Sequence, residues 1–245
     1  MSYETPLTIA EVMKDIAANK YVLPSIQREY VWDTEQIENL FDSLMRGYPI
    51  GTFLFWEVDK DTVSEYDFYG FIKNYHENKN SHNVKVDLKG SEGVTAVLDG
   101  QQRLTSIYLG LKGTYAYKLK YMARKNENAY PVRKLYLNLL SSPVDSDNKY
   151  DFRFLTNEEV QNDANTHWFE VGKILTMDKD GDPVMYINKY INFSSDFNYT
   201  QEQSDFAFDA LPRLYNIINK EKTLNYYREK EQKLDKVLNI FIRVN

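Results

Sequence analysis

The chain contains no cysteine among its 245 residues. Disulfide scaffolds, zinc sites built from thiolates and cysteine nucleophiles are therefore excluded. The sequence also lacks any run approaching the roughly 18 uncharged apolar residues that a membrane-spanning helix needs. Its first six residues, Met1–Pro6, have neither the basic start nor the apolar stretch of a secretion signal. Together these absences favour a cytoplasmic protein.

An excess of positive charge is also missing, because the formal net charge is -6. A protein-wide basic field for holding nucleic acid is therefore excluded, and any contact with DNA has to come from a local patch. The glycine-rich phosphate loop that ends in Gly-Lys-Ser/Thr is absent, which excludes a Walker-type NTPase. The three histidines, at positions 76, 82 and 167, lie in unrelated polar contexts and form no His-Asn-His metal nuclease motif.

The sequence does have the composition of a globular protein, with 42% hydrophobic, 15% aromatic and 27% charged residues. That suffices for one large domain or two small ones. Capping residues at Thr8 and Asp33 predict two helices, the second ending at Gly47. A short strand is predicted at Tyr21–Leu23 between them. The near-continuous apolar run Thr52–Val58 indicates a strand that is buried on both faces.

The rest of the chain predicts a second set of elements. Residues 59–93 are polar, and we expect a mobile insertion or an irregular loop there. The expected elements that follow are strands at 95–98, 114–121 and 134–140 and helices at 101–112, 201–220 and 226–243. The last helix reaches Asn245 without a cap, so we expect the natural protein to continue. The predicted fold is α+β, with a core at 1–113 and a hairpin and helical extension at 114–245.

The segment Asp99-Gly100-Gln101-Gln102-Arg103 stands where a predicted strand turns into a helix. The free amides of a first helical turn favour an anion such as phosphate. The two glutamines add amide donors, and the planar guanidinium of Arg103 suits phosphate oxygens. Asp99 is a candidate ligand for Mg²⁺ or a group that orients water. The alternative is that Asp99 caps the helix and its polar neighbours face solvent, and the local sequence slightly favours that alternative.

A second Gln-Arg pair, Gln27-Arg28, lies in another predicted strand-to-helix loop, which runs to Trp32. Two such loops at one edge of a sheet could converge on a single ligand. Alternatively, Tyr30 and Trp32 belong to the core and Arg28 makes a surface ion pair. In the C-terminal segment, Arg243 and Asn245 face either a pocket or solvent, and composition does not choose between the two.

Four ordered segments resemble the N-terminal domain of GmrSD-type restriction endonucleases, a family placed with the ParB/sulfiredoxin-like superfamily. The segments are Leu23–Trp32, Gly47–Gly51, Leu98–Thr105 and Phe241–Asn245. The resemblance is close over residues 7–111 and loose over 112–245. It implies a ParB-like core up to about Gly113, and binding and hydrolysis of a nucleoside triphosphate in a bacterial system that cuts modified phage DNA.

The same resemblance assigns roles to residues. Asp99, Gln101, Gln102 and Arg103 would be the hydrolytic set, with Mg²⁺ at Asp99. The nucleotide-binding residues would be Gln27, Arg28, Gly100, Arg243 and Asn245. In this family a nuclease usually occupies a separate C-terminal domain, so a C-terminal nuclease domain or a partner subunit is the expected partner.

A local basic patch lies between Lys112 and Tyr136, where seven cations face one acidic residue and tyrosines interleave with them. Basic and aromatic side chains together suit a surface that follows a nucleic-acid backbone and stacks its bases. The residues proposed to bind DNA are Lys118, Lys120, Arg124 and Lys125. The alternative, equally open, is a solvated hairpin whose tyrosines lie in the core.

The leading interpretation is a nucleotide-binding and NTP-hydrolysing module of a modification-dependent restriction system. Phosphoryl transfer is catalysed mainly by positioning and electrostatics, which suits a site of amides, arginine and one carboxylate. One rival is a non-catalytic module that binds DNA phosphates or a modified base in the same pocket. A direct nuclease ranks lower, because the lone Asp99 is weak support for two-metal cleavage. A toxin-like or structural scaffold with a decayed site is a further rival.

Overall fold

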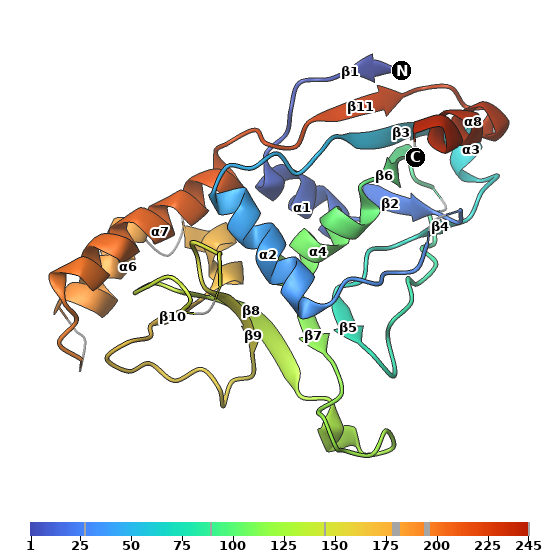
Figure 1. Cartoon of the computed structure of the whole chain (residues 1–245). Helices are drawn as coiled ribbons and strands as arrows, with labels where there is room; N and C mark the ends of the chain where they lie inside the picture. Colours follow the sequence, from blue (N-terminus) through green and yellow to red (C-terminus); the bar gives the residue numbers. More distant parts are fainter. Residues whose placement is uncertain (27, 89, 145, 178–181, 194–196, 245) are drawn as a thin grey trace.

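The computed structural model describes residues 1–26, 28–88, 90–144, 146–177, 182–193 and 197–244. It has an α+β fold, as predicted, with two sheets and helices packed against them (Figure 1). Among the described residues, none of the helices combines the length and the apolar composition needed to cross a membrane.

The first sheet has six strands in the order β1-β11-β3-β6-β2-β4. Their bounds are β1 Ser2–Tyr3, β2 Tyr21–Pro24, β3 Phe53–Asp59, β4 Phe68–Tyr69, β6 Gly93–Asp99 and β11 Tyr226–Glu229. Strands β3 and β6 pair antiparallel at the centre, whereas β2 runs parallel to β6. The first four residues of β3 are all buried, which confirms the prediction of a strand covered on both faces.

Helices cover one face of this sheet. They are α1 Ile9–Ala17, α2 Thr34–Met45, α4 Gln101–Lys112 and α7 Gln201–Asn219. Thr8 and Asp33 cap α1 and α2 with complete capping boxes, as their sequences predict. The buried side chains of these helices join one hydrophobic cluster that also takes in alternate residues of β3, such as Phe53 and Phe55.

The second sheet contains β5 Asn74–His76, β7 Thr114–Ala116, β8 Val132–Asn138, β9 Phe152–Leu155 and β10 Trp168–Glu170. Helix α4 leads directly from β6 of the first sheet to β7 of the second. The remaining short helical segments are α3 Lys60–Val63, η1 Glu127–Ala129, η2 Val171–Thr176, α6 Pro183–Ile187 and η3 Asn188–Phe193. The start of α4 therefore lies at the end of β6, where the candidate motif begins.

The prediction of a mobile insertion or an irregular loop at 59–93 is wrong for much of that segment. It contains α3, and it supplies β4 to the first sheet, where β4 pairs with β2. It also supplies β5 to the second sheet, where β5 runs parallel to β7. These strands have two and three residues, so their stability depends on partners that are distant in the sequence and leave no local periodic signal.

The expected helix at 226–243 is wrong in its first half. Tyr226–Glu229 form β11, which runs parallel to β3, and helix α8 extends only over Leu234–Val244. The predicted strand at 114–121 is also shorter, because β7 ends at Ala116. Since β11 belongs to the first sheet, the C-terminal segment contributes to the same sheet as residues 2–99. The proposed division at Gly113 stays a prediction.

Candidate functional site

The strand-to-helix turn at Asp99-Gly100 depends on glycine. Asp99 ends β6, and Gly100 has φ +89° immediately before α4 begins at Gln101. A Cβ at Gly100 would lie 2.2 Å from an atom of the Phe53 ring, so any other side chain would force the ring or the turn to move. The turn thereby places the first amides of α4 directly at the end of a central strand.

Gln101 combines burial with an unused acceptor. Its side-chain Nε2 donates to the backbone oxygen of Arg28 at 2.7 Å, and the residue is only 8% exposed. Its Oε1 is buried and accepts no hydrogen bond from any described residue. A buried acceptor without a donor costs free energy, and such groups in native structures usually have a partner. The position of this oxygen therefore suits a donor from a bound molecule.

Gln102 clamps the loop that precedes α2. Its Nε2 donates to the backbone oxygen of Glu29 at 2.9 Å, and its Oε1 accepts from the backbone N–H of Val31 at 3.1 Å. Together with Gln101, it joins the two loops that carry Gln-Arg pairs. The side chains of Gln101 and Gln102 thus hold the start of α4 against the backbone of the Arg28 loop, and Gln102 has a positioning role there.

Arg103 is anchored against the fold, so the alternative in which the polar neighbours of Asp99 face solvent is wrong for this residue. Its guanidinium donates to the backbone oxygens of Ile50 and Thr52 and to Asp99 Oδ2, the last at 3.3 Å. It also lies over the Phe53 ring, 4.7 Å from the centroid. Burial lowers the pKa of Arg103, while the Asp99 carboxylate opposes that shift. Because the guanidinium group binds the carbonyls of Ile50 and Thr52, it holds the segment before β3 in place.

The contact with Arg103 gives a structural role to Gly51 and to the carbonyl groups on either side of it. Gly51 has φ +84°, and a Cβ there would lie 2.5 Å from Arg103 Nη1. The carbonyls of Ile50 and Thr52 accept the two arms of the guanidinium. Gly47–Gly51 is one of the four segments that resemble the family. Its place in the order of those segments was the signal in the sequence for this contact.

Asp99 is half-buried and forms an ion pair with Arg103. Within the described residues, no group of three or more histidine, aspartate or glutamate side chains is arranged to hold a metal ion. Mg²⁺ in nucleotide sites commonly uses one or two carboxylates together with phosphate oxygens. The half-buried carboxylate of Asp99 at the start of α4 fits that donor set, and fits no cage made of protein ligands alone.

Two cavities adjoin the motif. One has a volume of about 240 Å³ and is lined by Arg28, which is exposed, and by the ion-paired side chains of Glu29 and His82, 3.0 Å apart. The other, about 490 Å³, is lined by residues 47–52, which include the two carbonyls held by Arg103. Neither cavity is lined by the side chains of Asp99–Arg103.

Tyr30 belongs to the core, in agreement with the structural alternative for its loop. It is 5% exposed, and its hydroxyl lies 2.8 Å from Ser106 Oγ on α4. Burial raises the pKa of Tyr30 above its ordinary value. The backbone oxygen of Trp32 accepts from the Tyr115 hydroxyl at 2.9 Å. The aromatic residues of this loop therefore fix its path between α4 and the second sheet.

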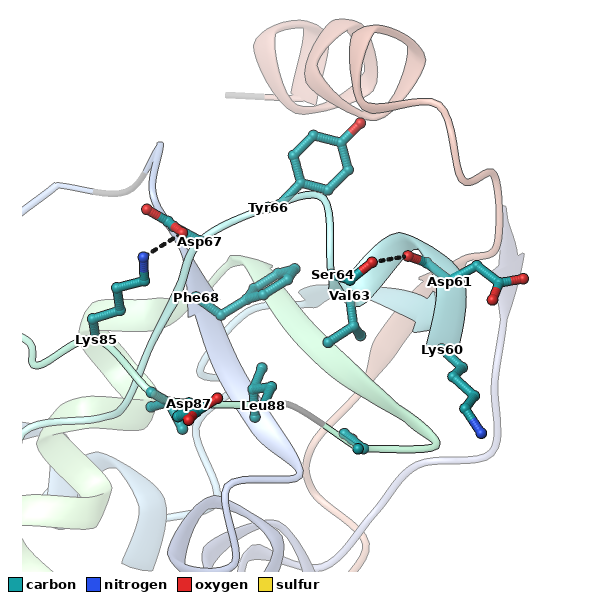
Figure 2. Close-up of a pocket in the computed structure, with 13 residues that line it drawn as sticks. Lys60, Asp61, Val63, Ser64, Tyr66, Asp67, Phe68, Lys85, Asp87 and Leu88 are labelled. Atoms are coloured by element: carbon teal, nitrogen blue, oxygen red, sulfur yellow. Dashed lines mark hydrogen bonds and ion pairs between the residues drawn. The ribbon is translucent and has the colours of Figure 1, made fainter.

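A third cavity, of about 700 Å³, is larger than the two beside the motif and lies away from them, between α3 and residues 85–91. Figure 2 shows Lys85 turned toward Asp67, and Tyr66 reaching toward a helix above it. Lys85 pairs with Asp67 at 2.6 Å, and Lys60 pairs with Glu92 at 3.2 Å. The cations on this wall are thus engaged within the chain.

Three of the predicted nucleotide contacts cannot be placed as side chains. Gln27 and Asn245 lie outside the described residues, and of Arg243 only its position in α8 is described. Helix α8 packs through Val237 with Trp56 and Leu98, on the face of the first sheet opposite α4.

The basic patch divides into engaged and free cations. Lys118 is folded inward, with Nζ donating to the backbone oxygens of Leu119 and Met122. The exposed cations without a side-chain partner among the described residues are Lys112, Lys120, Arg124 and Lys125, of which the last three lie between β7 and β8. We call residues 117–128 the basic loop. Figure 1 shows it projecting from the body of the molecule between β7 and β8.

The tyrosines of this region divide in the same way. Tyr115 and Tyr130 are buried, as the solvated-hairpin alternative expects. Tyr117 is 37% exposed and Tyr121 is fully exposed, with φ +65°. The basic loop therefore offers two aromatic surfaces and three free cations outside the core.

Comparison with known proteins identifies the chain's relatives. Residues 9–245 match the family model described as GmrSD restriction endonuclease, N-terminal domain. An uncharacterized protein of Methanocaldococcus jannaschii, MJ0686, is 32% identical over 111 residues, which are 45% of this chain and 18% of that protein. The match thus spans less than a fifth of that relative. Because the family model covers nearly the whole sequence, the chain belongs to the family of GmrSD restriction endonuclease N-terminal domains.

Proposed function

We propose that the chain is the nucleotide-binding and NTP-hydrolysing module of a modification-dependent DNA restriction protein used in phage defence. The observation that carries the proposal is the unpartnered Oε1 of Gln101 at the start of α4, a buried acceptor that a ligand would reach through a shift of the Gln101 side chain. A helix start favours phosphate, and the oxygen next to it suits a hydroxyl or amino donor of the same ligand. Membership of the GmrSD family supports the restriction context.

In this proposal each residue acts through the geometry described above. The triphosphate lies against the first-turn amides of α4, and exposed Arg28 closes over its oxygens. Gln101 accepts from the ligand or from the attacking water, while Gln102 keeps the Arg28 loop in place. Arg103 orients Asp99. Mg²⁺, when bound by Asp99 and phosphate oxygens, would neutralise the charge that develops during transfer.

A panel of nucleoside triphosphates, titrated with and without Mg²⁺, tests this proposal. Arg28→Ala should weaken binding about tenfold or more, because a charge-assisted phosphate contact is lost. The exposed Arg124→Ala on the basic loop is the matched control and should leave binding unchanged. Asp99→Asn should retain binding of the nucleotide alone and lose hydrolysis. Equal affinity of wild-type protein and Arg28→Ala for every nucleotide would contradict the proposed pocket.

The same variants separate the rivals. Nucleotide binding without turnover in the presence of Mg²⁺ would favour the non-catalytic binding module. Cleavage of DNA that Asp99→Asn abolishes, in the absence of nucleotide, would favour a direct nuclease. The proposed division of labour instead places DNA cleavage in a C-terminal nuclease domain or a partner subunit.

We further propose that the basic loop contacts DNA, because Lys120, Arg124 and Lys125 are exposed and have no side-chain partner in the part of the chain that the structure describes. Reversing these three residues to Glu should remove binding to duplex DNA and leave nucleotide hydrolysis intact. The wild-type affinity should fall with salt at a log-log slope of about -0.9 per neutralised phosphate. A control with Lys14, Lys173 and Lys189 reversed changes the net charge equally. Loss of DNA binding in both variants would mean that overall charge, and not the loop, determines it.

A further inference from the structure

A cavity of about 510 Å³ lies between α2 and β9, apart from the Asp99–Arg103 motif. Its walls are the first half of α2, the segment around β9 and Tyr117 at the start of the basic loop. The neighbouring residues of α2 and the segment before β9 are tied together, since Asp42 accepts from the backbone N–H groups of Lys149 and Tyr150. The cavity is therefore held open by a fixed framework.

Glu38 is a partly buried acid in the cavity wall, which also contains the buried Asp151. Its Oε1 accepts from the backbone N–H of Phe154 at 2.9 Å, and its Oε2 accepts from no described residue. Burial raises the pKa of Glu38 to about 7, although the Phe154 hydrogen bond and the charge of Arg153 oppose the shift. Such a carboxyl has acceptor capacity to spare and gains stability when a donor binds it.

The other charged groups leave the cavity rich in acceptors. The groups that face Glu38 are Glu35 on the same helix, Asp151 just before β9 and Arg153 in β9. Arg153 uses Nε and Nη2 in a bidentate pair with Asp151, at 2.8 and 3.0 Å. The lining also includes Tyr117 and Tyr150, and burial raises the pKa of Tyr150. A ligand with several N–H donors and no negative charge of its own in the cavity suits this wall.

The entrance of the cavity adjoins the basic loop. Tyr117 lines the cavity and remains 37% exposed, and the guanidinium of buried Arg133 lies 4.0 Å from its ring centroid. The free cations Lys120, Arg124 and Lys125 follow within the next eight positions. An acceptor-rich hollow, an aromatic side chain in its wall and cations that attract phosphates thus follow one another along the chain from Tyr117. The cations favour a polyanion over an arginine-rich peptide as the occupant.

We propose that this cavity receives a guanine-like nucleobase from a single strand whose phosphates lie on the basic loop, with Glu38 accepting its N–H donors and Tyr117 stacking on its ring. The proposal rests on the proposed DNA contact of the basic loop. Guanine presents two neighbouring donors, N1–H and N2–H, on its Watson–Crick edge, which a carboxylate matches. Thymine presents a single N–H between two acceptors and is the natural comparison.

Fluorescence anisotropy with labelled oligothymidine of about 12 nucleotides, with and without one central dG, tests the proposal. Wild-type protein should bind the dG strand about tenfold more tightly near pH 8. That preference should fall several-fold toward pH 6, because a protonated Glu38 loses its acceptor charge. Glu38→Gln keeps an acceptor for Phe154 and should lose both the preference and its pH dependence. Glu35→Gln, the matched control, should keep both.

The possible results separate a failure of this inference from a failure of the proposed DNA contact of the basic loop. If neither single strand nor duplex DNA binds wild-type protein, the DNA contact of the basic loop is wrong and the inference falls with it; if duplex DNA binds but neither single strand does, the DNA contact stands and the inference is overturned. If both strands bind but Glu38→Gln keeps the dG preference, the DNA contact stands and the inference is overturned. Tyr117→Leu provides a second variant and should weaken binding of the dG strand about tenfold. Binding of an arginine-rich peptide in place of either strand, abolished by Glu38→Gln, would also overturn the inference.

Discussion

Individual residues of the motif divide into those that hold the fold and those that remain available. Gln102 and Arg103 use their donors on backbone carbonyls, so their polar character is explained by the fold. Gln101 keeps an unused acceptor, and exposed Arg28 has no side-chain partner among the described residues. Which polar residues of the motif stabilise the fold, and which remain available to a ligand, therefore becomes clear only once their hydrogen-bond partners are known.

At this scale we expect Arg103→Ala to destabilise the protein by about 2–3 kcal/mol. The variant leaves the carbonyls of Ile50 and Thr52 without their donors and removes the cation over Phe53. Urea unfolding of wild type and variant measures the difference. Arg124→Ala, on the exposed basic loop, should stay within about 0.5 kcal/mol of wild type. An unchanged midpoint for Arg103→Ala would show that its contacts add nothing to the fold.

Among the elements, the loop before α2 is secured mainly from α4. Its path is fixed by the clamp of Gln102 on Glu29 and Val31 and by the hydrogen bond from Gln101 to Arg28. Tyr30 reaches Ser106 on the same helix. A loop tied to one helix at several points moves as part of that helix, so changes at the start of α4 should be transmitted to Arg28.

We expect Gln102→Ala to loosen this loop without unfolding the helix. The amide of Val31 loses its acceptor, so its hydrogen exchange should accelerate several-fold, while the amides of α2 keep their protection. Gln161→Ala, an exposed glutamine elsewhere, serves as the control. Unchanged exchange at Val31 would mean that the contacts of Gln101 and Tyr30 hold the loop without the Gln102 clamp.

For the whole molecule, two buried groups give opposite dependences of stability on pH. His167 is 6% exposed, and burial lowers its pKa to about 4. Because the unfolded histidine titrates near 6.5, its contribution is present above that pH and is lost as the pH falls toward 4. Glu38 has a raised pKa, so its contribution is present at low pH and is lost as the pH rises through about 7. The wild-type profile alone therefore blends the two effects.

A His167→Gln variant separates them. The stability of wild type relative to the variant should fall by about 3 kcal/mol between about pH 6.5 and pH 4. Denaturant unfolding at several pH values gives this difference directly. The stability of wild type relative to Glu38→Gln should instead rise as the pH falls over the same range. If the difference between wild type and His167→Gln is flat with pH, His167 is not held neutral in the fold.

The sequence by itself determined the local features of this protein. The capped starts of α1 and α2, the buried strand β3 and the Asp-Gly turn into α4 each depend on neighbours within a few residues. Only the tertiary structure decided that Tyr226–Glu229 form a strand beside β3 and that Arg103 points inward to Ile50 and Thr52. Those outcomes depend on hydrogen-bond partners far away along the chain, and no local period in the sequence records which distant group satisfies a given donor.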